Sequence, residues 1–176
     1  ALESGAPLME AVKALLETRP GRELSALGDP GEPPLLDCCD VLVLGGGTGG
    51  APAALAASRQ GARVIGGDAG DERGGVGTVG QIGRYWFGNR VGFTAEIDRE
   101  VSALETDATL RKNPGQWSPA AKSRWFENQC FAGGVIVFTR SLCSGVMVEG
   151  RAVTGLEVAT PYGYGRIEAK CVVDAT

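Results

Sequence analysis

The residues whose spacing most clearly indicates chemistry are Gly45, Gly47 and Gly50, which form the pattern Gly-x-Gly-x-x-Gly. Such a pattern suits an anionic dinucleotide. The first glycine permits a sharp turn, the second lets a pyrophosphate approach the backbone, and the third lets a helix pack closely on a strand. Backbone N–H groups at the start of that helix face the phosphates. Because the chain contains 28 glycines, the pattern alone is weak evidence. The elements on either side of it must decide whether it indicates a dinucleotide-binding site.

The elements around these glycines match the unit that the pattern requires. Residues 40–44 are a compact apolar run, which is typical of a strand buried on both faces. Residues 51–60 are alanine-rich and favour a helix, and residues 62–65 begin a second strand. The order of strand, glycine turn, helix and strand predicts a βαβ unit.

An acidic residue, Asp68, lies 18 positions beyond Gly50. A carboxylate at the end of the second strand is expected to accept hydrogen bonds from a ribose. Gly66 and Gly67 stand where apolar β-branched residues would be expected, so the ribose role of Asp68 is a weaker prediction than the glycine turn. The alternative interpretation is that the glycines only form turns and that Asp68 is a solvated loop residue.

The remainder of the chain predicts more of an α/β fold. Two further helices are predicted at residues 95–105 and 119–131, and a buried strand at residues 133–138 would extend the parallel sheet. Three short strands separated by turns then predict an antiparallel β-meander, at residues 145–149, 152–159 and 166–173. The predicted fold class is therefore α/β, a Rossmann-like parallel sheet with an inserted antiparallel meander.

The N-terminal segment differs in character from this predicted domain. Residues 6–18 have the spacing of a short amphipathic helix, and prolines and glycines make the stretch to about residue 36 a linker. We therefore expect a helix and linker arm at residues 1–36 and a Rossmann-like domain at residues 37–176.

Composition excludes several classes of function. The 176 residues contain no histidine, so neither a Ser-His-Asp nor a Cys-His hydrolase can be built from them alone. The five cysteines lack Cys-x-x-Cys spacing, which predicts no metal site and a reducing, cytoplasmic setting. The formal charge is −4 with no basic face, so nucleic-acid binding is not expected. No apolar run approaches the roughly 20 residues of a membrane span.

Two later segments point to a family. They are Gly-Gly-Val-Gly-Thr at residues 74–78 and Ile-Gly-Arg-Tyr-Trp-Phe-Gly-Asn at residues 82–89. With them, the sequence from about residue 38 to residue 176 resembles the N-terminal part of FAD-dependent oxidoreductases related to glutathione reductase and fumarate reductase flavoproteins. The resemblance implies FAD as the cofactor, an FAD/NAD(P)-binding fold, and electron or hydride transfer through non-covalently bound flavin.

The resemblance also implies roles for individual residues. The first glycine run would hold the ADP half of FAD with Asp68 at its ribose, and the second run would follow the pyrophosphate toward the flavin. A backbone group near Cys143, where a strand leads into the meander, would meet the adenine. The implied cofactor-binding residues are Gly45, Gly46, Gly47, Thr48, Gly49, Gly50, Asp68, Gly74, Gly75, Gly77, Thr78, Cys143, Ala175 and Thr176.

The family pattern also bears on the C-terminus. In this family the Asp-Ala-Thr segment, here residues 174–176, continues into Gly-Asp, whose acidic residue binds the ribityl chain. We therefore expect the FAD site to be incomplete at the C-terminus, and a C-terminal continuation or a partner chain to complete it. We also expect this chain alone not to turn over a substrate.

The candidates to approach the flavin within the chain are Tyr85, Trp86 and Asn89, and Arg84 or Arg90 could attract an anion. The expected partner of the flavin is a small-molecule substrate. The same aromatic residues would serve equally well as a plug that packs the loop onto the sheet. Two other functions stay open. One is an NAD(P)-dependent dehydrogenase, which shares the first glycine pattern, and the other is a non-catalytic nucleotide-binding or assembly subunit of a larger complex.

Overall fold

The structure is a computed structural model that describes residues 31–113 and 115–176. The helix predicted at residues 6–18 and most of the predicted arm lie outside the described residues, so the domain boundary at residue 36 stays a prediction. The chain from Pro33 to Thr176 forms one compact unit.

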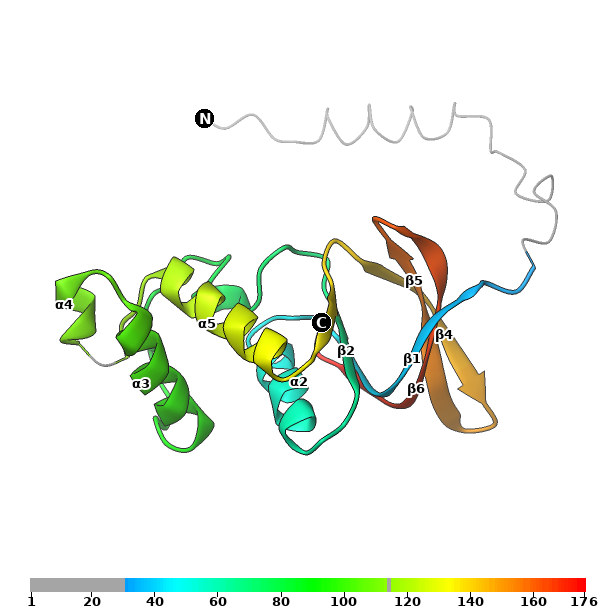
Figure 1. Ribbon diagram of the computed structural model, residues 1–176, viewed down its shortest axis with the longest axis horizontal. Coiled ribbons are helices and arrows are strands. Elements are labelled where there is room, and N and C mark those ends of the chain that lie inside the picture. The colour runs from blue at the N-terminus through cyan, green and yellow to red at the C-terminus, as the bar shows by residue number, and fades with distance from the viewer. Residues whose placement is uncertain (1–30, 114) are drawn as a thin grey trace, which may run out of the picture. The chain divides into compact units, whose positions relative to one another are not determined.

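A six-stranded sheet organises this unit, with the strand order β3-β2-β1-β6-β5-β4 (Figure 1). The pairs β1 with β2, β1 with β6, and β2 with β3 are parallel, whereas β4 with β5 and β5 with β6 are antiparallel. A parallel half and an antiparallel meander therefore share one sheet, which confirms the predicted α/β fold. The strands are β1 (Leu35–Leu44), β2 (Val64–Gly67), β3 (Ile136–Phe138), β4 (Leu142–Glu149), β5 (Ala152–Thr160) and β6 (Gly163–Asp174).

Four α-helices and one short 3-10 helix complete the unit. Figure 1 shows α3, α4 and α5 grouped on the side of α2 that is away from the meander strands β4 and β5. Ser118 caps α5 by accepting a hydrogen bond from the Ala121 N–H, and Asp107 caps the single turn of α4. The helices are α2 (Gly50–Arg59), α3 (Phe93–Leu104), α4 (Ala108–Arg111) and α5 (Pro119–Ala132), and the 3-10 helix is η2 (Gly75–Gly77).

The two faces of the sheet bury two separate apolar clusters. One cluster joins the helices to the sheet and contains Leu55, Trp125 and Phe126, each at most 2% exposed. The other lies on the opposite face, where Leu42 and Ile167 pack with residues of the meander. Burial on both faces explains why the end of β1 is a continuous apolar run rather than an alternating one.

Strand β6 has two roles, because it ends the meander and also pairs in parallel with β1. The register places Leu44 opposite Asp174, and the Ala175 N–H donates to the Leu44 carbonyl at 2.8 Å. On the other side of β1, the Gly45 N–H donates to the Gly67 carbonyl at 2.7 Å. The carboxyl ends of β2, β1 and β6 therefore meet, which is where an open α/β sheet binds its ligand.

Two strands differ in detail from their predicted bounds. Strand β1 starts at Leu35, within the predicted linker, because residues from Leu35 onward pair with β6 while their side chains stay largely exposed. Strand β2 continues through Gly66 and Gly67, which pair with Val43 and Leu44 of β1. Backbone pairing thus extends both strands beyond the bounds that the pattern of apolar side chains predicts.

Candidate dinucleotide-binding site

The first glycine turn follows β1 directly and leads into α2. Gly45 has φ of +91°, a left-handed conformation that favours glycine, and a Cβ added there would lie 2.6 Å from the Ala175 carbonyl oxygen. A Cβ on Gly50 would overlap the Gly45 carbonyl, so the third glycine allows α2 to start against the turn. By contrast, no atom lies within 4 Å of a Cβ placed on Gly47. The open space at Gly47 is where a phosphate could approach the glycine turn and the positive end of α2.

The Asp68 carboxylate lies at the carboxyl end of β2 and faces the glycine turn. One oxygen accepts a hydrogen bond from the Gly46 N–H, and the other accepts from the Gly70 N–H at 2.6 Å. The Asp68 main chain is fixed as well, because its N–H donates to the Phe138 carbonyl and its carbonyl accepts from the Ser141 N–H. Asp68 therefore orders the turn itself, and each oxygen keeps a further lone pair for a ligand hydroxyl.

We predict that Asp68→Ala lowers the free energy of unfolding of the ligand-free chain by about 2 kcal/mol, because the Gly46 and Gly70 N–H groups lose their acceptor. Asp68→Asn should lose about half as much, since its amide oxygen can still accept from one of them. Chemical denaturation of the three proteins measures the effect. Two variants as stable as the wild type would show that this carboxylate does not hold the turn.

The second glycine loop packs directly on the first. The Gly74 N–H donates to the Gly46 carbonyl at 2.9 Å, and the Thr48 hydroxyl donates to the Gly74 carbonyl at 3.4 Å. Gly75 has φ of +58°, and a Cβ on it would lie 2.8 Å from the Thr48 nitrogen. Thr78 is fully buried, and its hydroxyl donates to the Gly75 carbonyl. The two glycine loops are thus packed against each other, with Gly74, Gly77 and Thr78 of the second loop buried.

A cleft of about 420 Å³ opens at the carboxyl ends of β1, β2 and β6. It gathers six of the residues that the sequence predicts as cofactor-binding, although they come from four separate segments of the chain. These residues are Gly45, Gly47, Asp68, Cys143, Ala175 and Thr176. Ser141 and Leu142, which sequence reasoning missed, also line the cleft.

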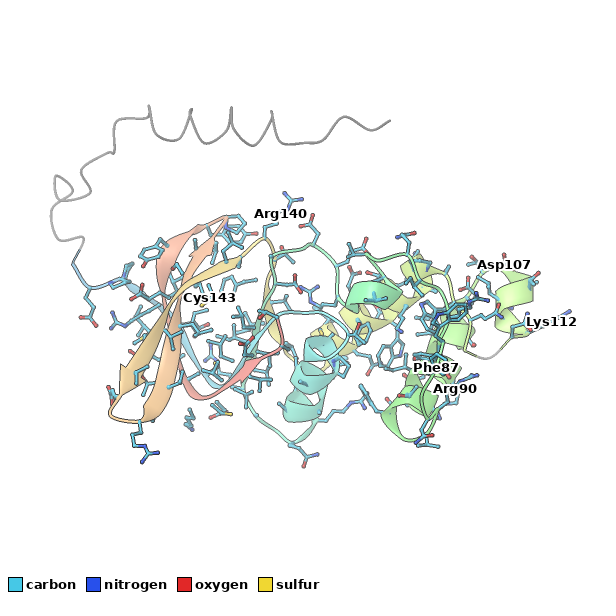
Figure 2. All side chains as sticks on the ribbon, turned by 180° about the vertical axis from the view of Figure 1, so that it is seen from behind. Phe87, Arg90, Asp107, Lys112, Arg140 and Cys143 are labelled. Atoms are coloured by element: carbon cyan, nitrogen blue, oxygen red, sulfur yellow. The ribbon has the colours of Figure 1, made fainter. Side chains whose placement is uncertain are left out.

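Cys143 lies near the start of β4, and Figure 2 shows it on the sheet, just beyond the loop that carries Arg140. The Cys143 thiol donates to the Gly145 carbonyl at 3.4 Å, so it has a local partner. Arg140 forms a two-pronged ion pair with Asp71, which joins the loops that follow β2 and β3. The Arg140 guanidinium also holds the pKa of the Asp71 carboxyl below its usual value, chiefly through this hydrogen bonding.

The predicted flavin-facing residues do not line this cleft. Tyr85 is half-buried against Trp117, with ring centroids 4.6 Å apart, whereas Trp86 is 75% exposed beneath Arg84. Asn89 is exposed as well. Figure 2 shows the neighbouring Phe87 and Arg90 beside the helices, well away from Cys143. The approach of Tyr85, Trp86 and Asn89 to a flavin therefore stays a prediction.

Two buried cations near the glycine loops were also missed by sequence reasoning. Arg73 and Lys122 are only 9% and 5% exposed. Arg73 precedes the second glycine doublet directly, which is a signal that the sequence offered. Lys122 belongs to α5, and no spacing in the sequence connects it to a glycine loop that lies more than 40 residues earlier.

A second, open cleft of about 500 Å³ lies around the amino-terminal half of β1. Its cations already have partners, since Lys170 pairs with Asp40 and Arg63 pairs with Asp37, each at 2.7 Å. This cleft therefore offers an anion little free charge. Within residues 31–113 and 115–176, no group of three or more Cys, Asp or Glu side chains could hold a metal ion. No helix in the described part of the chain is long and apolar enough to cross a membrane.

The fold and the first glycine turn at the carboxyl ends of the strands define a dinucleotide-binding α/β domain. Residues 40–176 match the family described as FAD dependent oxidoreductase, and the chain belongs to that family. FAD is therefore the dinucleotide that the family implies, and the chain is an FAD-binding portion of a flavin-dependent oxidoreductase. None of the curated proteins matches the sequence significantly.

Solved structures with the same fold include a geranylgeranyl bacteriochlorophyll reductase-like protein from Thermoplasma acidophilum, with 18% identity and a TM-score of 0.55. A myxobacterial chondrochloren halogenase, described as FAD-dependent, has 21% identity and a TM-score of 0.55. Glycerol-3-phosphate dehydrogenase from Bacillus halodurans, complexed with FAD, has 18% identity and a TM-score of 0.55.

The matches cover 81%, 80% and 78% of this chain, in that order, but only 40%, 37% and 34% of those proteins. At these identities the similarity shows the fold alone. The chain thus spans less than half the length of each of these three proteins.

Proposed function

We propose that this chain binds FAD non-covalently in the cleft at the carboxyl ends of β1, β2 and β6, for transfer of electrons or hydride between the flavin and a small-molecule substrate. The observation that carries the proposal is the convergence in one cleft of the first glycine turn, Asp68, Cys143 and residues 175–176. Membership of the FAD-dependent oxidoreductase family supports FAD over a nicotinamide dinucleotide.

Each part of the site has a task in this proposal. The glycine turn that leads into α2 binds the diphosphate through its backbone N–H groups and the positive end of the helix dipole. Asp68 accepts from the ribose hydroxyls with its remaining lone pairs, and the backbone around Cys143 meets the adenine. The second loop, from Gly74 to Thr78, leads from the diphosphate toward the isoalloxazine. When bound, the flavin supplies the redox chemistry, and the chain supplies position and electrostatics.

Catalysis in this proposal needs more polypeptide than this chain. The three compared proteins are each more than twice as long as the segment that matches, which supports a second part that covers the flavin and binds the substrate. A flavin left open to water would lack the dry surroundings that direct its reactivity. We therefore propose that a further polypeptide segment or a partner completes the site, and that this chain alone does not turn over a substrate.

We predict that the purified chain shows flavin absorption bands and that denaturation releases all of the flavin from the 18.2 kDa polypeptide. Non-covalent contacts disappear on unfolding, whereas a covalent link would survive. Ultrafiltration after denaturation, with FAD measured in the filtrate, checks the prediction. Flavin retained with the polypeptide would contradict the non-covalent form. A protein that binds NADH but never FAD, or neither, would contradict the proposed function itself.

A further inference from the structure

Two buried cations beside the glycine loops have no ion-pair partner among the described residues. Neither Arg73 nor Lys122 has a hydrogen-bond acceptor or a carboxylate within ion-pair distance among the described residues, although both are more than nine-tenths buried. Other cations of the domain are paired, such as Arg59 with Glu96 and Arg140 with Asp71, at 2.6 Å each. An unpaired buried ion costs several kcal/mol, so such groups are candidates for a functional role.

Each of these cations touches one of the two glycine loops. The Arg73 Cγ lies 3.3 Å from the position that a Cβ on Gly46 would occupy, and Arg73 lines a small cavity together with Gly46 and Asp68. The Lys122 Nζ lies 2.8 Å from the position that a Cβ on Gly77 would occupy. The Lys122 ammonium and the apolar stem of Arg73 therefore lie directly against the two glycine loops.

Lys122 is held in place by aromatic rings rather than by an anion. Its Nζ lies 3.8 Å from the centroid of the Trp117 ring and 5.1 Å from that of Tyr85, and the Trp117 indole N–H donates to the Gly77 carbonyl at 2.8 Å. Cation–π contacts of this kind stabilise an ammonium while leaving its charge unneutralised. The ammonium and the glycine loop are thus fixed relative to each other.

The titratable groups around Lys122 are Asp98 on α3, and Tyr85 and Arg90 on the loop before it. Asp98 is already engaged, because one of its oxygens accepts from Arg90 at 2.9 Å, while its other oxygen is buried without a partner in the described residues. Burial lowers the pKa of Lys122 to about 8, although the negative charge of Asp98 acts to raise it. Burial is also the main cause that raises the pKa of Tyr85 to about 12, so Tyr85 stays neutral near pH 7.

We propose that Arg73 and Lys122 supply the positive charge that holds the diphosphate of a bound dinucleotide at the two glycine loops. This inference rests on the proposed function. The diphosphate carries two negative charges, and the Gly46 N–H of the first turn is already bonded to the Asp68 carboxylate, so the remaining N–H groups and the helix dipole alone would not balance that charge. Two cations behind the loops balance that charge, and low-dielectric surroundings make their attraction stronger than that of exposed lysines.

Binding of FAD, ADP and adenosine tests this inference, because adenosine has no diphosphate. The neutral variants are Arg73→Met and Lys122→Met, which keep an unbranched side chain, and the charge-conserving controls are Arg73→Lys and Lys122→Arg. Each neutral variant should bind FAD and ADP at least roughly tenfold more weakly while adenosine binding stays within about twofold. The controls should recover most of the lost affinity.

The affinity of the wild type for FAD should also depend on pH. A bound anion favours the protonated form of Lys122, so its pKa rises on binding, and affinity is highest below about pH 8 and falls as the pH rises through that value. Lys122→Met should abolish this fall in affinity, whereas Arg73→Met should keep it, because Lys122 is unchanged in that variant. Isothermal titration between about pH 6.5 and 9 measures both.

The outcomes separate the two proposals. A wild-type chain that binds neither FAD nor ADP overturns the proposed function. If the wild type binds both, neutral variants with unchanged ADP affinity overturn the inference, as does an equal loss of adenosine binding, because that loss indicates a purely structural role. If Lys122→Met does not fold, the pH dependence of FAD affinity in the wild type tests the role of Lys122 instead. An FAD affinity that is constant with pH overturns the proposal that Lys122 holds the diphosphate.

Discussion

Gly47→Val is expected to weaken FAD binding at least about 100-fold, which corresponds to roughly 3 kcal/mol, while the ligand-free protein keeps its stability to within about 0.5 kcal/mol. The reason is that no described protein atom lies within 4 Å of a Cβ at this position, so the protein itself leaves room for a side chain to begin there. It would occupy the space that the diphosphate needs above the first turn of α2.

Two measurements on the same samples check this prediction. Fluorescence titration gives the affinity for FAD, and thermal unfolding without ligand gives the stability. Gly47→Ala serves as a graded control, because its single methyl group should weaken binding less than valine does. Near-normal flavin content in Gly47→Val would show that Gly47 serves only the turn, and the candidate site would then have to lie elsewhere.

The elements that sequence patterns predicted best are those whose signals are local. The run from residue 40 to residue 60 carries its own strand, turn and helix signals, and the structure confirms strand β1 running into α2. Helix α5 was predicted at residues 119–131, and the structure places its cap at Ser118 with Pro119 in the first turn. These features depend on neighbours within a few residues, so one sequence is sufficient to show them.

The elements that were missed depend on contacts between distant residues. Strand β1 begins at Leu35 because β6, about 130 residues later, pairs with it. Helix α4 has only four residues, too few for any periodic pattern, and is held where the Arg111 side chain donates to the Glu105 carbonyl. Neither signal exists within a short window of the sequence.

The candidate site likewise has features that the sequence predicts and features that depend on contacts between distant residues. The glycine spacing indicated which backbone positions must be free of side chains, and the structure shows a specific close approach at Gly45, Gly50 and Gly75. The pattern could not show that Asp68 binds the Gly46 N–H, because 22 residues separate them. It could not show the Lys122 ammonium behind Gly77 either, since that contact requires α5 to be packed in place.

The second large effect is expected at Gly50, where alanine should lower the free energy of unfolding by at least about 3 kcal/mol or prevent folding altogether. A Cβ there would overlap the Gly45 carbonyl oxygen and would also lie 3.1 Å from the Ala175 Cβ. Neither group can move easily, because the Gly45 N–H is bonded to Gly67 and the Ala175 N–H is bonded to Leu44. Helix α2 would have to shift away from the sheet and lose part of its apolar packing.

The preceding residue provides a matched control for this change. Gly49→Ala adds the same methyl group one position earlier in the same turn, where no atom lies within 4 Å of the new Cβ. Its effect should stay within about 1 kcal/mol, the usual cost of alanine at a helix N-cap. Chemical denaturation of the two variants without FAD compares them directly. Equal stability for Gly50→Ala and Gly49→Ala would mean that α2 does not need the close approach at Gly50, and the third glycine would then have to be explained by ligand binding rather than by packing.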